Sequence, residues 1–238
     1  MSRPFVSVVT PTYNRKRFIS AMVACYKAQT YPKDRMEWIV LDDGSEKVGE
    51  VFLDATKGLP NIRYIELPEK LNIGAKRNIL NKEAKGEIIV CMDDDDYYVP
   101  ERVSHVVTKL MSQPQIDFVG SSEIYMYYTS CGVILKMGPY GKNHSTNGTM
   151  AYRARYAKTH LYDESVTFNE EKSFTNDYTT PLLQLDPMKV MLVISHSENT
   201  FNKDRFLNDP TNPFVKKTTM KVREFIKDKS LRDFYSTA

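Results

Sequence analysis

Hydrophobic and polar positions alternate in blocks along the first hundred residues. Apolar runs of strand length occur at 5–10, 37–42, 62–67 and 87–92. Residues 17–29 place Phe18, Met22, Cys25 and Tyr26 at helical spacing. Residues 74–86 are bounded by glycines that suit a helix start and a C-terminal cap. This order predicts βαβ units, and therefore an α/β fold with a mostly parallel sheet flanked by helices.

The pattern becomes less regular further along the chain. Pro100 suits the first turn of a helix over 100–111. Apolar runs predict strands at 124–128, 132–137 and 190–195. We also expect a helix at 152–161 and a closing amphipathic helix within 216–235. The chain is thus divided into residues 1–112, a smaller mixed half at 113–205, and a helical tail at 206–238.

Composition narrows the class of protein without identifying it. The chain has 41% hydrophobic and 26% charged residues, as ordinary globular proteins do, and a net charge of +3 argues against nucleic acid as a partner. Its apolar runs are too short to span a membrane, and the N-terminus lacks an apolar signal segment. We therefore expect a cytoplasmic protein in which Cys25, Cys91 and Cys131 are buried free thiols.

Four consecutive aspartates, Asp93 to Asp96, follow the fourth apolar run. Adjacent carboxylates about 5 Å apart repel by roughly 3 kcal/mol at an effective dielectric constant near 20. Mg²⁺ and Mn²⁺ prefer carboxylate oxygens, and a bound dication would turn this repulsion into attraction. If the strand continues, Asp93 and Asp95 face one site. The alternative is a solvated acidic loop.

Other polar segments follow the first and second strands, at 11–15 and 42–45, and parallel sheets bind ligands at such strand ends. Tyr13 can stack on a base, or it is an ordinary half-buried aromatic. Asp43 can accept hydrogen bonds from a ribose or a base, although Asp-Gly-Ser is also ordinary turn chemistry. Lys76 and Arg77 can neutralise a diphosphate, or they lie on a solvated helix face.

Taken in order, 7-SVVTPTYNR-15, 38-WIVLDDGS-45, 72-NIGAKRN-78 and 84-AKGEIIVCMDDDDYYVPER-102 resemble family-2 glycosyltransferases with the GT-A (Rossmann-like) fold. The resemblance covers residues 5 to about 111. The second half matches more loosely, through 148-GTMAYR-153, 163-DES-165, 170-EEKSF-174 and 196-HSENTFN-202.

The resemblance implies a nucleotide-sugar donor bound by residues 1–112 and an acceptor bound by residues 113–205. On this basis Tyr13 stacks on the base, Asp43 reads it with Asp42 beside it, and Arg77 and Lys76 face the diphosphate. The residues implied in donor binding are Pro11, Thr12, Tyr13, Asn14, Arg15, Asp42, Asp43, Lys76, Arg77, Asp93 and Asp94. Asp95 is implied as the first ligand of Mn²⁺ or Mg²⁺, with Asp93 and His196 as further ligands.

Catalysis and acceptor binding are placed in the second half by the same resemblance. Glu171 stands where the family has a catalytic aspartate, and Glu170 is the alternative base. Asp96 is expected to orient the donor sugar or the acceptor. The acceptor side is expected to include Gly148, Thr149 and Met150.

The sequence therefore predicts a metal-dependent inverting glycosyltransferase that transfers a sugar from a nucleoside diphosphate, with UDP or dTDP favoured and GDP possible, to a hydroxyl of a glycan or another acceptor. A sugar nucleotidyltransferase is the second interpretation, although the segment PTYNRKR lacks the glycines of its phosphate loop. A non-catalytic nucleotide- or carbohydrate-binding module is the third. A polymerase is disfavoured by the modest charge.

Overall fold

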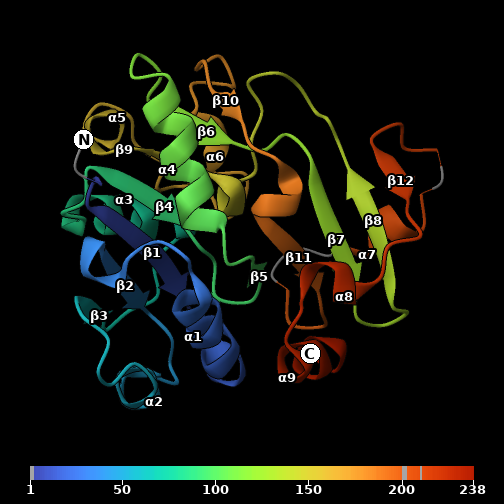
Figure 1. The fold of residues 1–238 in the computed structure, drawn as a ribbon, viewed down its shortest axis with the longest axis horizontal. Helices are drawn as coiled ribbons and strands as arrows, with labels where there is room; N and C mark the ends of the chain where they lie inside the picture. Colours follow the sequence, from blue (N-terminus) through green and yellow to red (C-terminus); the bar gives the residue numbers. More distant parts are fainter. Residues whose placement is uncertain (1–2, 200–202, 210) are drawn as a thin grey trace.

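Two β-sheets lie next to each other in the computed structural model, which describes residues 3–199, 203–209 and 211–238 (Figure 1). The first sheet has the order β10-β6-β9-β4-β1-β2-β3. Its strands are β1 (Val6–Thr12), β2 (Met36–Asp42), β3 (Ile62–Glu66), β4 (Ile88–Cys91), β6 (Phe118–Gly120), β9 (Ala151–Arg153) and β10 (Leu183–Gln184). Strands β1 to β4 are mutually parallel where they pair, and β9 is antiparallel to β4 and β6. The predicted α/β fold with a mostly parallel sheet is confirmed.

Both faces of this sheet are covered by helices, which explains the continuous apolar runs of its central strands. Alternate residues of a strand point to opposite faces, so Val8 and Val9 enter two different hydrophobic cores. The core around Val8 includes residues of α1 (Ile19–Ala28), α2 (Gly49–Ala55) and α4 (Arg102–Ser112). The core around Val9 includes residues of α3 (Ile73–Glu83), α5 (Ala154–Ala157) and α6 (Glu171–Phe174).

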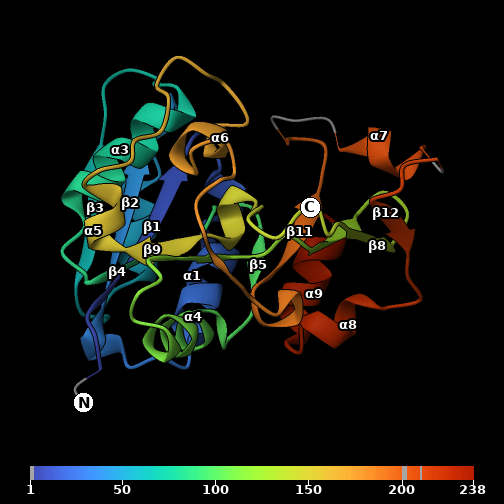
Figure 2. The ribbon, with the colours of Figure 1, turned by 90° about the horizontal axis from the view of Figure 1, so that it is seen from above.

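The second sheet has the order β12-β8-β7-β11-β5. Its strands are β5 (Tyr97–Tyr98), β7 (Ile124–Tyr128), β8 (Val133–Met137), β11 (Met191–Ser195) and β12 (Val215–Lys217). Strand β5 directly follows the acidic run and pairs with β11. The acidic run therefore passes from the end of one sheet to the edge of the other, between the two halves seen in Figure 2.

Two predicted helices are wrong in extent. Residues 151–153 form β9 instead of a helix, because Tyr152 pairs with both Ile89 and Phe118, and only the single turn α5 follows. The expected closing helix is divided, because residues 215–217 pair with β8 as an edge strand. The remaining helices are α7 (Asp204–Leu207), α8 (Val222–Phe225) and α9 (Lys229–Ser236), with 3-10 turns η1 (Lys16–Phe18), η2 (Lys33–Arg35), η3 (Asn147–Thr149) and η4 (Pro187–Lys189).

Two further expectations can be compared with the structure. Within residues 3–199, 203–209 and 211–238, no helix has the length and apolar character needed to cross a membrane. Cys25 and Cys91 are buried free thiols, as predicted, whereas Cys131 is exposed. Cys131 lies in the turn between β7 and β8.

Candidate active site

The polar segments identified in the sequence start from one edge of the first sheet. Strand β1 lies between β2 and β4, and its last residue, Thr12, is in register with Asp42. On the other side Val9 is in register with Cys91, two residues before the first aspartate of the acidic run. The loops that begin after Thr12, Asp42 and Cys91 therefore share one rim, at the carboxyl ends of parallel strands.

A cluster of one carboxylate, two ammonium groups and an aromatic ring occupies the β1–β2 end of this rim. The Asp43 carboxylate is buried and accepts hydrogen bonds from the Leu71 N–H and the Lys76 ammonium, each 2.8 Å long. The Lys70 Nζ lies 4.2 Å from the centroid of the Tyr13 ring, and the Lys76 Nζ lies 5.8 Å from it. The cluster carries one more positive than negative charge, which suits an anionic ligand.

Asp42 contributes to the shape of the rim through bonds within the protein. Its Oδ1 accepts the Gly44 N–H at 2.7 Å. Its Oδ2 accepts the Val48 N–H at 2.9 Å and the Tyr64 hydroxyl at 2.7 Å. Burial and this carboxylate raise the pKa of Tyr64. Asp42 is thus engaged in holding the turn after β2.

The loop after β1 is joined to that turn by Asn14. Asn14 has a left-handed backbone (φ 53°), and its Oδ1 accepts the Glu46 N–H at 3.0 Å. A Cβ added to Gly44 would lie 2.7 Å from the same oxygen and 2.8 Å from the backbone nitrogen of Asn14, so this close approach of the loops requires glycine. Pro11 and Thr12 are buried at the end of β1 and form the base of the loop.

Arg77 connects the acidic run to the start of α6. Its Nε donates to Glu170 Oε1 at 2.9 Å and its Nη1 donates to Asp93 Oδ1 at 3.1 Å. The Asn147 amide donates to the same Glu170 oxygen at 3.2 Å, and the Tyr162 hydroxyl donates to Asn147 Oδ1 at 2.8 Å. Burial alone would lower the pKa of Arg77, but Asp93 and Glu170 raise it well above its ordinary value. Among the described residues none accepts a hydrogen bond from its Nη2, which leaves that nitrogen for a ligand.

Glu171 differs sharply from its neighbour Glu170. Its carboxylate has no hydrogen bond from another residue in the described part of the chain. Burial, followed by the charge of Glu170, raises its pKa from 4.5 to about 7. A carboxylate without a partner and with a pKa near neutrality has the properties of a general base.

The four aspartates form a loop between β4 and β5, so the premise that they continue a strand is wrong. Asp93 binds Arg77, as described above, whereas Asp95 points toward His196. Burial and the charge of Asp95 raise the pKa of Asp94 to about 7. Asp96 Oδ1 accepts the Ile194 N–H of β11 at 2.8 Å, and burial raises the pKa of Asp96. The four carboxyl groups therefore lie in four different environments.

Asp95 has the densest set of polar neighbours in the acidic loop. Its Oδ2 lies 3.1 Å from His196 Nε2, 3.3 Å from the Asn199 amide nitrogen and 3.8 Å from Arg15 Nε. Burial raises the pKa of Asp95, but His196, Lys203 and Arg15 outweigh burial and hold the pKa at about 2. Asp95 is therefore a carboxylate that remains charged at any physiological pH.

Asp95 and His196 are the side chains best arranged to hold a metal ion. In the described part of the chain no group of three His, Cys, Asp or Glu side chains is gathered in a metal-binding arrangement. The pair supplies one oxygen and one nitrogen ligand, and a divalent cation bound there would take its other ligands from water and substrate phosphates. The residues present thus suit a cation that arrives with a diphosphate.

The three residues expected on the acceptor side lie in different environments. A Cβ added to Gly148 would lie 3.1 Å from Asp93 Oδ2, so Gly148 borders the acidic loop. The buried Thr149 hydroxyl accepts the Ser121 N–H at 2.9 Å, and Met150 lies in the core beneath α3 and α6. Thr149 and Met150 therefore support the backbone on which Gly148 is presented.

Several polar residues of the site were not identified from the sequence, namely Lys70, Asn147, Tyr162 and Asn199. The first three reach the site only because distant loops fold onto it, and nothing in their local sequence indicates this. Asn199 had a weak signal in the sequence, because it lies three residues after His196. In the structure its amide nitrogen is 2.7 Å from His196 Nε2.

Comparisons with known proteins agree with this architecture. Residues 7–172 match the model of glycosyl transferase family 2. The chain is 30% identical over 92 residues to the poly(ribitol-phosphate) beta-N-acetylglucosaminyltransferase TarS of Staphylococcus aureus, a match that covers 38% of the chain and 16% of TarS. It is 25% identical over 203 residues to an uncharacterized glycosyltransferase of Methanocaldococcus jannaschii, covering 77% of the chain and 69% of that protein.

Solved structures share the fold at lower identity. The mannosyltransferase PcManGT of Pyrobaculum calidifontis, solved with GDP-Man and Mn²⁺, has a TM-score of 0.66 and 16% identity, covering 84% of this chain and 59% of its own. Residues 1–349 of TarS with UDP-GlcNAc have a TM-score of 0.65 and 19% identity, covering 82% of this chain and 59% of that one. An uncharacterized Haemophilus influenzae glycosyltransferase is matched over 37% of its length. The chain thus spans only part of several of these relatives.

The parallel sheet and its acidic rim define an α/β protein of the GT-A class. Because the family model matches well over half of its residues, the chain belongs to glycosyl transferase family 2, as the sequence motifs predicted.

Proposed function

We propose that the protein is a metal-dependent inverting glycosyltransferase that transfers a sugar from a nucleoside diphosphate to a hydroxyl group of a glycan or another acceptor. The observation that carries this proposal is the contrast between two carboxylates at one site. Glu171 has no partner among the described residues and a pKa of about 7, whereas Asp95 is held ionised beside His196. The first suits proton removal and the second suits a metal-bound diphosphate.

The donor is proposed to lie along the rim. The base stacks on Tyr13 near Lys70 and Lys76, and the free nitrogen of Arg77 binds the diphosphate. TarS with UDP-GlcNAc and PcManGT with GDP-Man support a nucleotide-sugar donor. We keep UDP or dTDP as the favoured donor base, with GDP possible.

Asp95 and His196 would hold Mn²⁺ or Mg²⁺, which when bound neutralises charge on the diphosphate leaving group. Glu171 removes the proton of the acceptor hydroxyl, whose oxygen attacks the anomeric carbon from the face opposite the diphosphate. The bond between this carbon and the diphosphate oxygen breaks, and the nucleoside diphosphate leaves with the electron pair. The configuration at the anomeric carbon is inverted, and the proton remains on Glu171.

Other residues of the site have supporting roles in this proposal. Asp96 accepts a hydrogen bond from the Ile194 N–H and so positions the acidic loop against β11. Glu170 fixes Arg77, and Asp42 and Asn14 shape the loops that carry Asp43 and Tyr13. In this proposal Asp93 and Asp94 border the ribose and diphosphate, and Arg15 lies behind Asp95.

A nucleotide screen tests the donor site. Thermal unfolding is measured with UDP, dTDP, GDP, CDP and ADP, with and without Mn²⁺, for the wild type and for Asp95→Asn. Binding at ~100 times the dissociation constant adds about 2.7 kcal/mol, a readily measured shift. We expect one nucleotide to stabilise the wild type only with Mn²⁺, and Asp95→Asn to lose this shift.

The exposed Asp34 provides a matched control, because Asp34→Asn makes the same chemical change far from the rim. Release of nucleoside diphosphate from the matching nucleotide sugar then tests transfer. A nucleotidyltransferase would instead release pyrophosphate from a nucleoside triphosphate, and a binding module would release neither product. Equal nucleotide binding by the wild type and Asp95→Asn would contradict the assigned metal site.

A further inference from the structure

Four aromatic rings from the loops after β8, before β12 and after α6 form a continuous row. The ring centroids of Phe214 and Tyr140 are 5.1 Å apart, those of Tyr140 and His144 are 4.8 Å apart, and those of His144 and Tyr178 are 4.7 Å apart. All four side chains are partly exposed. Burial lowers the pKa of His144, which favours the neutral form of its ring. We call these four residues the aromatic row.

One end of the aromatic row lies at the proposed base. The Tyr178 hydroxyl donates to Asn169 Oδ1 at 3.2 Å, and Asn169 immediately precedes Glu170. Burial, followed by the charge of Glu171, raises the pKa of Tyr178. Through Asn169, Tyr178 ties this end of the aromatic row to the segment that carries Glu170 and Glu171.

Tyr178 is held there against the preference of its backbone. Asn176, Asp177 and Tyr178 have φ angles of 51°, 54° and 57°, three consecutive left-handed residues without a glycine. Backbone strain of this kind persists where the surrounding structure requires it, commonly at functional sites. The Tyr178 N–H donates to Thr175 Oγ1 at 3.3 Å, which anchors the turn to the end of α6.

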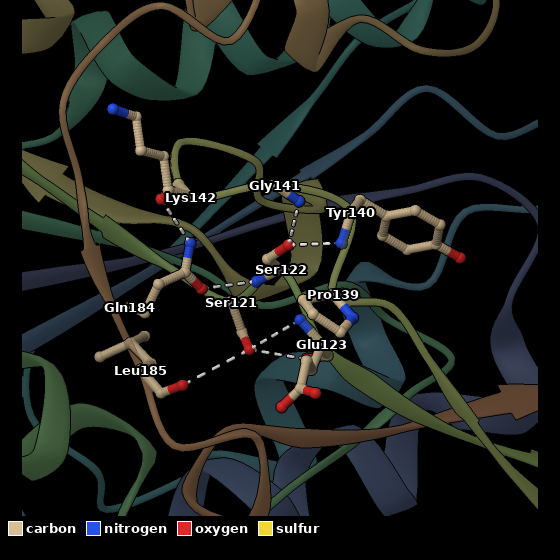
Figure 3. A pocket seen from close by; sticks show the side chains of 9 residues that line it. All are labelled: Ser121, Ser122, Glu123, Pro139, Tyr140, Gly141, Lys142, Gln184 and Leu185. Carbon is tan, nitrogen blue, oxygen red and sulfur yellow. Dashed lines mark hydrogen bonds between the residues drawn. The ribbon is translucent and has the colours of Figure 1, made fainter. Parts of the chain in front are cut away.

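The other part of the aromatic row borders a cavity of about 450 Å³, a size typical of small-molecule sites (Figure 3). Its polar lining includes Ser121, Ser122, Glu123, Lys142 and Gln184. Ser122 Oγ accepts the N–H groups of Tyr140 and Gly141, at 2.7 and 2.9 Å. The Gln184 amide donates to the carbonyl of Lys142 at 2.9 Å and its oxygen accepts the Ser122 N–H at 2.8 Å. The loop that carries Tyr140 is therefore fixed before any ligand binds.

We propose that the aromatic row and this cavity bind the acceptor, and that the acceptor is a carbohydrate of at least two sugar rings. The inference rests on the proposed function, because it takes Glu171 as the base. A pyranose has a face of C–H groups, which packs on the negative face of an aromatic ring, and an edge of hydroxyls, which suits the polar lining of the cavity. A row of several rings leading away from the base matches a chain of sugars better than a single hydroxyl compound.

The lining of the cavity carries few charged residues. Glu123 is paired with Lys136 at 2.7 Å, and the other charged residue of the lining is Lys142. The lining thus has no concentration of positive charge of the kind that would favour a phosphate-bearing acceptor. A hydroxyl-bearing peptide is the alternative that the experiment must separate from a carbohydrate.

Binding is tested first, without donor. Saturation-transfer NMR is recorded with the wild type and a panel of neutral disaccharides and trisaccharides, and with a serine-containing peptide. We expect contact with at least one oligosaccharide, which is lost in Tyr140→Ala and Tyr178→Ala and retained in Tyr140→Phe and Tyr178→Phe. Phe168→Ala removes an exposed ring that lies outside the row and serves as the matched control.

Transfer is tested second, with the acceptor found by NMR. We expect each alanine variant to raise the KM for the acceptor about two- to tenfold, the loss that corresponds to one aromatic contact, with the KM for the donor as internal reference. Oligosaccharide contacts that do not change in either alanine variant would overturn the inference, as would a protein that binds and glycosylates only the peptide. If carbohydrate binding follows the aromatic row but no nucleotide sugar binds, the proposed function fails while the carbohydrate surface stands.

Discussion

The adjacent residues Glu170 and Glu171 are expected to respond to the same isosteric substitution with opposite changes in stability. Glu170 Oε1 accepts hydrogen bonds from Arg77 and Asn147, and both Glu170 and Arg77 are nearly buried. Removing one partner of a buried ion pair costs about 3–5 kcal/mol. Arg77 also keeps Asp93 at 3.1 Å, so for Glu170→Gln we expect a smaller loss of about 2–3 kcal/mol. In a protein of this size that corresponds to a melting temperature lower by about 4–12 °C.

Glu171→Gln is expected to stabilise the protein at alkaline pH. In the unfolded chain Glu171 loses its proton near pH 4.5, whereas in the folded protein it does so at about pH 7. Between these values the unfolded state binds fewer protons, so the wild type loses stability as the pH rises. At about 1.4 kcal/mol for each pH unit, the loss reaches about 3 kcal/mol at pH 8. The glutamine side chain does not ionise, so the variant does not lose this stability. The free energies of unfolding of the two proteins should converge below pH 4.5.

The rate of sugar transfer should not follow the stability of these variants. Without its general base, Glu171→Gln should transfer sugar about 10²- to 10⁴-fold more slowly. The wild-type rate should rise through about pH 7 and level off above it, because only the ionised carboxylate accepts the proton. Calorimetry at pH 4.5 and 8, with single-turnover transfer measured across that range, supplies the data. Glu50→Gln, on the exposed face of α2, is the control and should change stability by less than about 0.5 kcal/mol.

The reasoning would be refuted if Glu171→Gln destabilised the protein at pH 8 and transferred sugar at the wild-type rate. It would also fail if Glu170→Gln left the melting temperature unchanged but abolished transfer, because Glu170 would then be the base and its pairing with Arg77 would be incidental.

Three other substitutions test how the rim is held together. Tyr235→Phe removes the hydroxyl that donates to the Asp96 carbonyl at 3.1 Å. We expect the free energy of unfolding, measured by calorimetry, to fall by about 1–3 kcal/mol, and Mn²⁺-dependent nucleotide binding to weaken. Unchanged nucleotide affinity would show that α9 does not position the acidic loop. Asp42→Ala removes the acceptor of three hydrogen bonds and should cost about 3 kcal/mol in urea unfolding, whereas a loss below about 1 kcal/mol would contradict its role in the turn. Lys76→Met leaves the buried Asp43 carboxylate without its ion pair and should cost about 3 kcal/mol by calorimetry at pH 7, whereas a loss below about 1 kcal/mol would contradict a structural role of the pair.

The parts of the fold that could be predicted are those that local patterns determine. Strands β1 and β2 are buried on both faces, so their continuous apolar runs were visible in the sequence. Strand β9 could not be recognised, because Tyr152 and its neighbours become strand only through pairing with β4 and β6. The edge strand β12 likewise exists only because residues 215–217 lie against β8.

The same division holds for the candidate site. Motif order placed Tyr13, Asp43, Arg77 and the acidic run on one rim, because strand ends of a parallel sheet must meet there. The sequence could not separate the roles of Glu170 and Glu171. That separation depends on which carboxylate Arg77 reaches across 93 positions of the chain. Side-chain pairing over such distances has no local signal.

Tertiary contacts reduce the repulsion that four adjacent aspartates would otherwise cause in the acidic run. Four adjacent full charges would repel strongly, but the fold does not maintain four full charges in one environment. Asp93 is paired with Arg77, and Asp95 is held ionised beside His196 and Arg15. Burial instead raises the pKa of Asp94 and of Asp96, which favours the neutral form of both. The charges that remain are thus separated onto two side chains with different partners. One of them, Asp95, keeps its negative charge at the place where a cation and a diphosphate would meet, so the same contacts that make the loop stable also leave it able to bind.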